Sequence, residues 1–519
     1  MTTPPAAVHR SALPKRQPGA AYGRHPRRLL AAPRGRSCGL TRTDGVVVLA
    51  VAVGATIYAI FGLRVYRSLH ASAFDLAFFD QILWNTAHGR WFETTYVAYN
   101  FLGQHFELLL LPLALLYRLG AGPQTLVVVQ AAGAALAALP LYIAGRRLLR
   151  APAAALLAVA YLVSPALQRG VDFGFHPDLF EPLAAFGALA ALLWRRDRLF
   201  LLAVVLLLLL KEDAFLVALG LGWIALLCGR KRLGLSVIAV SLAWGVLVLA
   251  LIMPHLRHGA SSDLAERYGY LGDKPLAIVA GALLHPDRVL GHLAAPVPAT
   301  AVFVLLAGFA FLPLLAPDVL LAAIPAALVG LLSTHPQQRA LDVQYGAPVL
   351  TLVVVAVMFG AARAERWAPR LAARLSRCSR ARAFRRLARG LPACALAAAL
   401  LAAYLRGPYP PERAAARWRF ADDGSAAALA RVSGLIPPDA SLSAQTGLAP
   451  HLSQRRVQWE FPRLKDAEYV ILQTNGIRSS QSLLAGFDQT AASLPALGYQ
   501  PIASDGTIRL YRRQAGGSR

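Results

Sequence analysis

The chain has 519 residues, of which 56% are hydrophobic and only 15% charged, and its mean hydropathy is +0.49. Soluble globular proteins are usually about 45–50% apolar and about 25% charged, so this composition excludes an ordinary soluble protein and indicates an integral membrane protein. The net charge of +26 does not indicate nucleic-acid binding, because the basic residues collect in short loops between apolar runs and in two tails, as the positive-inside rule predicts.

The N-terminal segment is strongly basic. Residues 1–44 carry nine Lys or Arg and no acid before Asp44, without apolar periodicity, which predicts a disordered cytoplasmic tail. The first apolar run lies too far from Met1 for a signal peptide, so we expect it to be retained as a membrane helix. The cysteines show no metal-ligand spacing and fall in or next to segments that we place in the cytoplasm, which argues against a disulfide framework. They are Cys38, Cys228, Cys378 and Cys394.

Residues 45–405 form a predicted membrane domain. Assigning its basic clusters to the cytoplasmic side predicts that its apolar runs cross the membrane eleven times. This arrangement places every basic cluster inside, including 363–389 with ten Arg and one acid, and every acid-rich loop outside. The N-terminus is then cytoplasmic and the C-terminus extracytoplasmic. The predicted crossings are 45–63, 124–145, 152–165, 183–194, two within 199–228, 233–253, two within 299–333, 346–362 and 391–405.

The first external loop, 64–123, is the most polar stretch near the N-terminus. It opens with FDLAFFDQILWNTAHG, whose apolar residues follow helical spacing with Asp75 and Asp80 on other faces. This pattern predicts an amphipathic helix on the membrane surface. The following apolar segment, 105–120, is short and interrupted by Pro112. Because the next basic cluster must be inside, we interpret this segment as a re-entrant or jutting helix within the external loop.

Residues 406–519 are more polar and predict a small extracytoplasmic α/β domain of about 100 residues. It contains no dinucleotide-binding glycine motif, P-loop or nucleophile elbow. The domain either caps the membrane part or contacts substrate directly, and the sequence leaves both open. The expected helices are 423–437, 446–454 and 482–498, and the expected strands are 440–445, 456–461, 467–473 and 507–513.

Several long blocks of the chain resemble the bacterial membrane proteins grouped as domain of unknown function 2079. These are FDLAFFDQILWNTAHGRWFETT, GQHFELLLLPLALLYRL, VVQAAGAALAALPLYIAGRRLL, DFGFHPDLFEPL, LLLLLKEDAFL, VQYGAPVL and IPPDASLSAQTGLAPHLSQRR. The resemblance covers residues 45 to 475. The architecture of that family is similar to the C-type glycosyltransferases (GT-C fold), which take sugar from a polyprenyl-phosphate carrier on the outer membrane face. The resemblance implies an all-α polytopic fold of this kind, with the α/β domain appended.

The resemblance also implies site residues. In the GT-C superfamily the first external loop carries an acid at the start of a surface helix and a glycine about fourteen residues on, and Asp75 and Gly89 match this placing. A second acid commonly lies in the next external loop, where Asp172 or Asp178 matches. The superfamily often has adjacent acids at the first site, whereas here a leucine follows Asp75 and the next acid is Asp80.

Asp75 is the candidate catalytic base. Glycosyl transfer to a hydroxyl passes through an oxocarbenium-like transition state and needs a base for the acceptor's proton. Partial desolvation at the membrane interface raises a carboxylate's pKa toward that task. Asp75 alternatively caps the surface helix. Asp80 is the second catalytic candidate, and it either pairs with Asp75 or faces water.

The remaining polar candidates fall in the other external segments. Carboxylates and imidazole between Asp172 and Glu181 have the chemistry to hold a divalent cation against a lipid phosphate, although Pro177 and Asp178 equally fit a turn and a helix cap. Charges at membrane depth are usually functional or paired, so Lys211 either meets the donor phosphate or pairs with an acid. The predicted substrate- or phosphate-binding residues are His105, Glu107, Asp172, His176, Asp178, Glu181, Lys211, Glu212, Asp213, His335, Arg339 and Tyr345.

These patterns predict a glycosyltransferase of the cytoplasmic (inner) membrane that moves a sugar from a polyprenyl-phosphate donor to an extracytoplasmic glycan, lipid or protein acceptor. Its partners are then the bilayer, the lipid-linked sugar and the acceptor, without nucleic acid, and a divalent metal ion is the one cofactor considered. The alternatives are a transporter or lipid flippase, which would favour inverted repeats that the sequence does not show, and a non-catalytic membrane scaffold.

Overall fold

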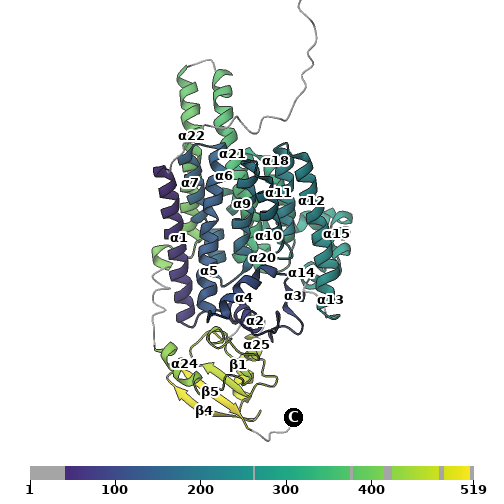
Figure 1. Ribbon diagram of the computed structural model, residues 1–519, viewed down its shortest axis with the longest axis vertical. Coiled ribbons are helices and arrows are strands. Elements are labelled where there is room, and N and C mark those ends of the chain that lie inside the picture. Colours follow the sequence, from purple (N-terminus) through teal and green to yellow (C-terminus); the bar gives the residue numbers. More distant parts are fainter. Residues whose placement is uncertain (1–40, 261–263, 375–377, 414–423, 479–483, 515–519) are drawn as a thin grey trace, which may run out of the picture.

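The protein consists of a long bundle of helices with a small sheet domain at one end (Figure 1). The predicted disordered tail lies outside the described residues except for its last four positions. The computed structural model describes residues 41–260, 264–374, 378–413, 424–478 and 484–514.

Within the described residues, five helical segments are long and apolar enough to cross a membrane, and seven if each of two bent helix pairs is one span. The predicted total of eleven crossings remains a prediction, because the other apolar helices are shorter. The five are α1 (Arg42–Arg67), Pro123–Leu148 with α5 (Pro123–Leu136) and α6 (Ala138–Leu148), Lys231–Leu256 with α12 (Lys231–Val246), Pro336–Arg370 with most of α21 (Ala347–Arg374), and Arg382–Arg413 with most of α22 (Cys378–Arg406). The bent pairs are α7 (Ala151–Leu162) with α8 (Pro165–Asp172), and α16 (Pro286–Leu293) with α17 (Pro296–Ala307).

Shorter helices complete the bundle. Three of them, α9, α10 and α11, lie in its middle (Figure 1). The bundle interior is rich in alanine; Ala134, Ala138, Ala158 and Ala188 are fully buried, and such small side chains let membrane helices approach closely. The shorter helices are α9 (Glu181–Leu193), α10 (Asp197–Leu208), α11 (Phe215–Leu227), α13 (Met253–Leu256), α14 (Leu264–Tyr268), α15 (Pro275–Leu284), α18 (Pro317–Leu320), α19 (Ile324–Leu331) and α20 (Pro336–Arg339).

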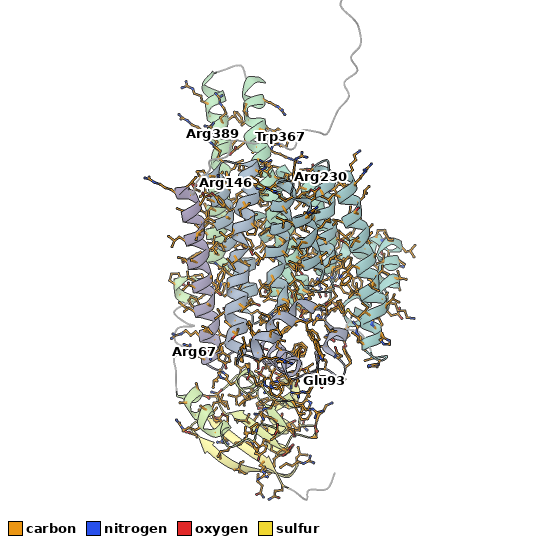
Figure 2. The ribbon with its side chains drawn as sticks, viewed as in Figure 1. Arg67, Glu93, Arg146, Arg230, Trp367 and Arg389 are labelled. Carbon is orange, nitrogen blue, oxygen red and sulfur yellow. The ribbon has the colours of Figure 1, made fainter. Side chains whose placement is uncertain are left out.

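Basic side chains gather at the end of the bundle opposite the sheet domain. Arg146, Arg230 and Arg389 lie there, whereas Arg67 and Glu93 lie near the sheet domain (Figure 2). The helices α21 and α22 project beyond the bundle at the same basic end (Figure 1). This segregation is the one that the positive-inside rule produces in membrane proteins.

The C-terminal domain is a five-stranded sheet in the order β2-β1-β3-β5-β4, with β1 parallel to β2 and β3, and β5 antiparallel to its neighbours. The predicted fold class, a helical membrane protein with a small α/β domain, is confirmed. The sequence missed β4, whose residues are mostly exposed and include a bulge at Pro501. The elements are α24 (Ser425–Ser433), β1 (Leu442–Ala444), β2 (Gln458–Glu460), β3 (Tyr469–Gln473), α25 (Leu484–Ser493), β4 (Tyr499–Asp505) and β5 (Ile508–Arg513).

The first external loop folds between the bundle and this domain. It contains a π-helix, η1 (Ala73–Ala77), followed by α2 (Phe78–Ala87), α3 (Phe101–Gln104) and α4 (Leu111–Tyr117). Pro112 lies in the first turn of α4 and so begins this helix rather than interrupting it.

The expectation of a water-facing side on α2 is wrong. All its residues except Trp84 are buried, including Asp80. The reason is tertiary, because α2 packs in one apolar cluster with α4 and with C-terminal residues such as Leu448. Tyr117 donates a hydrogen bond to one Asp80 oxygen and Ser453 to the other, each at 2.6 Å. Asp80 therefore faces neither water nor Asp75; it ties α4 to the C-terminal domain.

The buried Asp80 carboxyl makes the unfolding free energy of the protein depend on pH. Burial raises the pKa of Asp80 from 3.8 to about 6, against the lowering effect of its two hydroxyl donors. The folded protein keeps the Asp80 proton up to about pH 6, whereas the unfolded chain releases it near pH 4. The stabilisation that this proton gives is therefore complete below pH 4, and it is lost as the pH rises through 6. Relative to Asp80→Asn, the wild type should lose about 2–3 kcal/mol of unfolding free energy between pH 4 and pH 7.

Thermal unfolding of detergent-purified protein across this pH range measures the difference. Asp488, exposed in the C-terminal domain, supplies a matched Asp488→Asn control that should follow the wild type. Parallel profiles for the wild type and Asp80→Asn would contradict the assignment.

Candidate functional site

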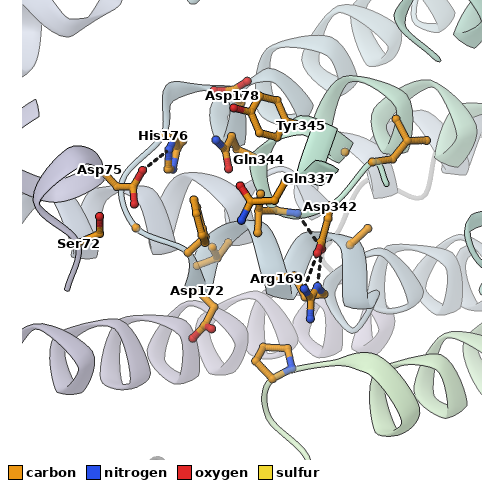
Figure 3. A pocket seen from close by; sticks show the side chains of 18 of the residues that line it. Ser72, Asp75, Arg169, Asp172, His176, Asp178, Gln337, Asp342, Gln344 and Tyr345 are labelled. Carbon is orange, nitrogen blue, oxygen red and sulfur yellow. Dashed lines mark hydrogen bonds and ion pairs between the residues drawn. The ribbon is translucent and has the colours of Figure 1, made fainter. Parts of the chain in front are cut away.

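A cavity of 1550 Å³ lies at the end of the bundle next to the C-terminal domain. The first external loop, the loop after α8 and the segment 335–346 form its polar walls, and the C-terminal domain contributes Thr446 and Ile477 (Figure 3). Of the predicted residues, those lining the cavity are Asp75, His105, Glu107, Asp172, His176, Asp178, Lys211, His335 and Tyr345. Those not lining it are Asp80, Glu181, Glu212, Asp213 and Arg339.

Asp75 faces His176 across the cavity wall. Its Oδ1 lies 3.3 Å from His176 Nε2, and the two side chains are only 13% and 10% exposed (Figure 3). Asp75 lies within the π-helix η1, a local form that often occurs at functional sites. The alternative that Asp75 caps the helix is wrong, because the N-cap position belongs to Ser72. Asp75 is thus free of a capping role and directed at an imidazole.

Gln130 on α5 holds the loop that carries His176. Its amide oxygen accepts from the His176 backbone N–H at 2.5 Å, and its amide nitrogen donates to the carbonyls of Val171 and Gly174. Gly174 has φ +140°, and a Cβ there would lie 2.8 Å from Asp75 Cβ. Only glycine allows this loop to approach Asp75 so closely.

Lys211 lies in the break between α10 and α11. Its Nζ is 2.6 Å from Asp178 Oδ1, and both side chains are buried. The alternative that Asp178 caps the following helix is therefore wrong, since the N-cap of α9 is Phe180. Glu107 and Asp213 also lie close enough to act on the Lys211 charge.

Glu212 turns away from the cavity and binds the first external loop. It accepts from the Phe106 backbone N–H at 3.0 Å and lies 2.9 Å from His105 Nδ1. Glu181 is fully buried and lies close enough to Lys211 and Asp178 to interact with their charges. Carboxyls therefore outnumber cations around Lys211, and this arrangement does not favour the predicted phosphate contact for Lys211.

The opposite side of the cavity carries a second ion pair. Arg169 on α8 binds both oxygens of Asp342 at 2.5 Å (Figure 3). Leu341 and Val343, on either side of Asp342, have φ of 49° and 48°, a conformation that is strained for non-glycine residues and is concentrated at functional sites. Neither Arg169 nor Asp342 is among the site residues predicted from the sequence, although they lie three positions from Asp172 and Arg339, which are.

One wall of the cavity is apolar and comes from four membrane helices. It is formed by Val65 on α1, Val127 on α5, Val304 on α17 and Leu405 on α22. Arg406 and Arg413 follow at the end of α22 and also line the cavity. The cavity therefore joins an apolar surface to a charged one.

A family model described as predicted membrane protein (DUF2079) matches residues 65–508. The chain belongs to this family. No curated protein matches the sequence at a significant level.

The DUF2079 protein is similar in structure to solved membrane proteins. ArnT from Cupriavidus metallidurans bound to undecaprenyl phosphate has a TM-score of 0.52 and 16% identity, over 92% of this chain and 100% of that one. The archaeal oligosaccharyltransferase AglB from Archaeoglobus fulgidus, in complex with an inhibitory peptide and a dolichol-phosphate, has a TM-score of 0.40 and 13% identity over 90% and 74%. At 16% identity the likeness to ArnT shows the fold alone, which is GT-C.

The candidate site for a divalent cation lies between Asp172 and Glu181. Throughout the part of the DUF2079 chain that the structure describes, no group of three or more His, Cys, Asp or Glu side chains is arranged to hold a metal ion. Within this loop, one Asp178 oxygen is bound to Lys211, and His176 is bound to Asp75. The geometry therefore gives no support to a metal at this position.

The Lys211–Asp178 pair should stabilise the fold only while both members are present. Lys211→Met leaves Asp178 as an uncompensated buried carboxylate, at a cost of about 3–5 kcal/mol, whereas the double variant Lys211→Met/Asp178→Leu should recover much of the loss. Thermal unfolding in detergent measures both. Arg431, 64% exposed in its ion pair with Asp505, is the control, and Arg431→Met should cost less than about 1 kcal/mol. Equal destabilisation in the single and double variants would show that the charges are not paired.

Proposed function

We propose that this DUF2079 protein is a membrane glycosyltransferase that moves a sugar from a polyprenyl-phosphate donor to an acceptor outside the cytoplasmic membrane. The observation that carries the proposal is the Asp75–His176 pair in a cavity with an apolar wall. The GT-C fold supports it, since ArnT, with the same fold, has been solved with undecaprenyl phosphate bound.

The apolar wall suits the polyprenyl chain of the donor. It runs along α17 and α22 to the arginines at the end of α22, where guanidinium groups can bind a phosphate through two parallel hydrogen bonds. We assign the donor phosphate to the side of the cavity with Arg169, Arg406 and Arg413, and Arg406 is its contact, because Arg169 is bound to Asp342 and Arg413 donates to backbone carbonyls. The reactive sugar carbon then lies between these arginines and Asp75.

Asp75 acts as the base in this scheme. The acceptor hydroxyl attacks the anomeric carbon of the sugar, the bond from that carbon to the phosphate oxygen breaks, and polyprenyl phosphate leaves with the bonding electrons. Asp75 takes the hydroxyl proton. His176 orients the carboxylate through its Nε2, and Gln130 holds His176 in place.

The basic end of the bundle belongs in the cytoplasm by the positive-inside rule, which puts the C-terminal domain and the cavity on the outer face. The domain covers the cavity with Thr446 and Ile477. We therefore assign it both roles considered from the sequence, as a cap and as a contact for the glycan, lipid or protein acceptor.

Transfer of radiolabelled sugar from polyprenyl-phosphate donors, measured in membranes, tests the base. Asp75→Asn should lower the rate by at least about 100-fold, because the amide cannot accept the proton. Glu93→Gln, which changes an exposed acid of the same loop, should keep wild-type activity. Equal transfer by the wild type and Asp75→Asn would overturn the assignment of Asp75. Lipid flipping without transfer from any donor would favour the flippase alternative.

A further inference from the structure

Among the residues that the structure describes, three buried oxygen atoms that belong to cavity-lining side chains have no hydrogen-bond partner. They are Glu107 Oε2, Asp178 Oδ2 and Gln344 Oε1, and their side chains belong to residues only 1%, 2% and 6% exposed. A buried acceptor left without a donor costs about 1–3 kcal/mol, so three of them beside one cavity indicate groups that a ligand completes.

The three oxygens come from three separate segments. Glu107 precedes α4, Asp178 lies before α9, and Gln344 lies before α21. Gln344 and Asp178 lie on the same side of the cavity, opposite Arg169 (Figure 3). Asp178 Oδ2 and Gln344 Oε1 are acceptors. Burial raises the pKa of Glu107 well above its usual value, and its protonated carboxyl still keeps acceptor lone pairs. The complementary ligand group is therefore a hydrogen-bond donor such as a hydroxyl or an ammonium.

The charged groups around these oxygens also favour a ligand that donates hydrogen bonds over an anion. Lys211 is already bound to Asp178, and Glu107 and Asp213 act on the same ammonium group. Behind them, His105 is bound to Glu212. An anion placed here would meet more carboxyls than cations, whereas a group rich in hydroxyls would meet acceptors.

On the basis of the proposed function, we propose that Glu107, Asp178 and Gln344 form the pocket for the transferred sugar, and that this pocket accepts a neutral or amino sugar and rejects an acidic one such as a uronic acid. The donor then lies across the cavity. Its phosphate is at the Arg169 side, its anomeric carbon is near Asp75, and its hydroxyls donate to the three unpaired oxygens.

Binding of three matched probes tests the pocket. The probes are a short isoprenyl phosphate, the same lipid phosphate carrying a neutral hexose, and the same lipid phosphate carrying a hexuronic acid. They are titrated into the purified full-length protein in a detergent without a sugar head group, with thermal stabilisation as the readout. We expect the hexose lipid to bind at least about tenfold more tightly than the hexuronate lipid, a difference of about 1.4 kcal/mol.

Two variants test which side chains cause the preference for the hexose lipid over the hexuronate lipid. Glu107→Gln keeps the shape of the side chain but removes its carboxyl group, so it should weaken binding of the hexose lipid by about tenfold and narrow the ratio of its affinity to that of the hexuronate lipid. Gln344→Leu removes the amide without changing charge, and it should bring the affinity for the hexose lipid toward that for the isoprenyl phosphate alone. Glu93→Gln, on the exposed part of the first external loop, should keep the wild-type ratio.

The outcomes separate the two proposals. Failure of all three probes to bind would contradict the proposed function. Binding of the isoprenyl phosphate together with equal or tighter binding of the hexuronate lipid would overturn the sugar pocket and leave the proposed function standing. If both Glu107→Gln and Gln344→Leu kept the wild-type ratio of hexose-lipid affinity to hexuronate-lipid affinity, the sugar-pocket proposal would likewise be wrong.

Discussion

The ion pair between Lys211 and Asp178 is the interaction on which the polar end of the cavity depends. An ammonium group in the interior of a helical bundle is stable only if a carboxylate compensates it, and Asp178 does so at 2.6 Å. The pair joins the break between α10 and α11 to the segment before α9. Because Asp178 is held there, the preceding loop can place His176 against Asp75.

Three segments of irregular backbone line this cavity. In a membrane protein, non-helical backbone is tolerated where it is buried in protein or lines a polar cavity. The π-helix of Asp75, the glycine loop at Gly174 and the strained segment around Asp342 all line the cavity. Each brings a polar side chain to a place that a regular membrane helix would fill with apolar residues.

The C-terminal domain packs against the first external loop and buries part of it. Without it, α2 would have one side in water. With Ser453 bound to Asp80 and the Gln81 amide bound to the Arg455 carbonyl, this side is buried. The domain therefore belongs to the folded core at this end of the bundle, and its position over the cavity follows from these same contacts.

The sequence by itself determined the membrane class, the segregation of basic segments and the small α/β domain, because hydropathy, charge placement and periodicity are local properties that a single chain displays. It also marked Asp75, His176 and Lys211 as candidate site residues, Lys211 because a charge at membrane depth is costly. It missed β4, whose mostly exposed residues carry no apolar alternation.

Only the tertiary structure decided what those polar residues do. Asp80 and Asp75 lie five positions apart in one helical stretch, yet one ties the C-terminal domain to α4 and the other faces the cavity. The partners of Lys211 and Arg169 are 33 and 173 positions away. Such pairings depend on how the helices are packed in three dimensions, and no local pattern in the chain records them.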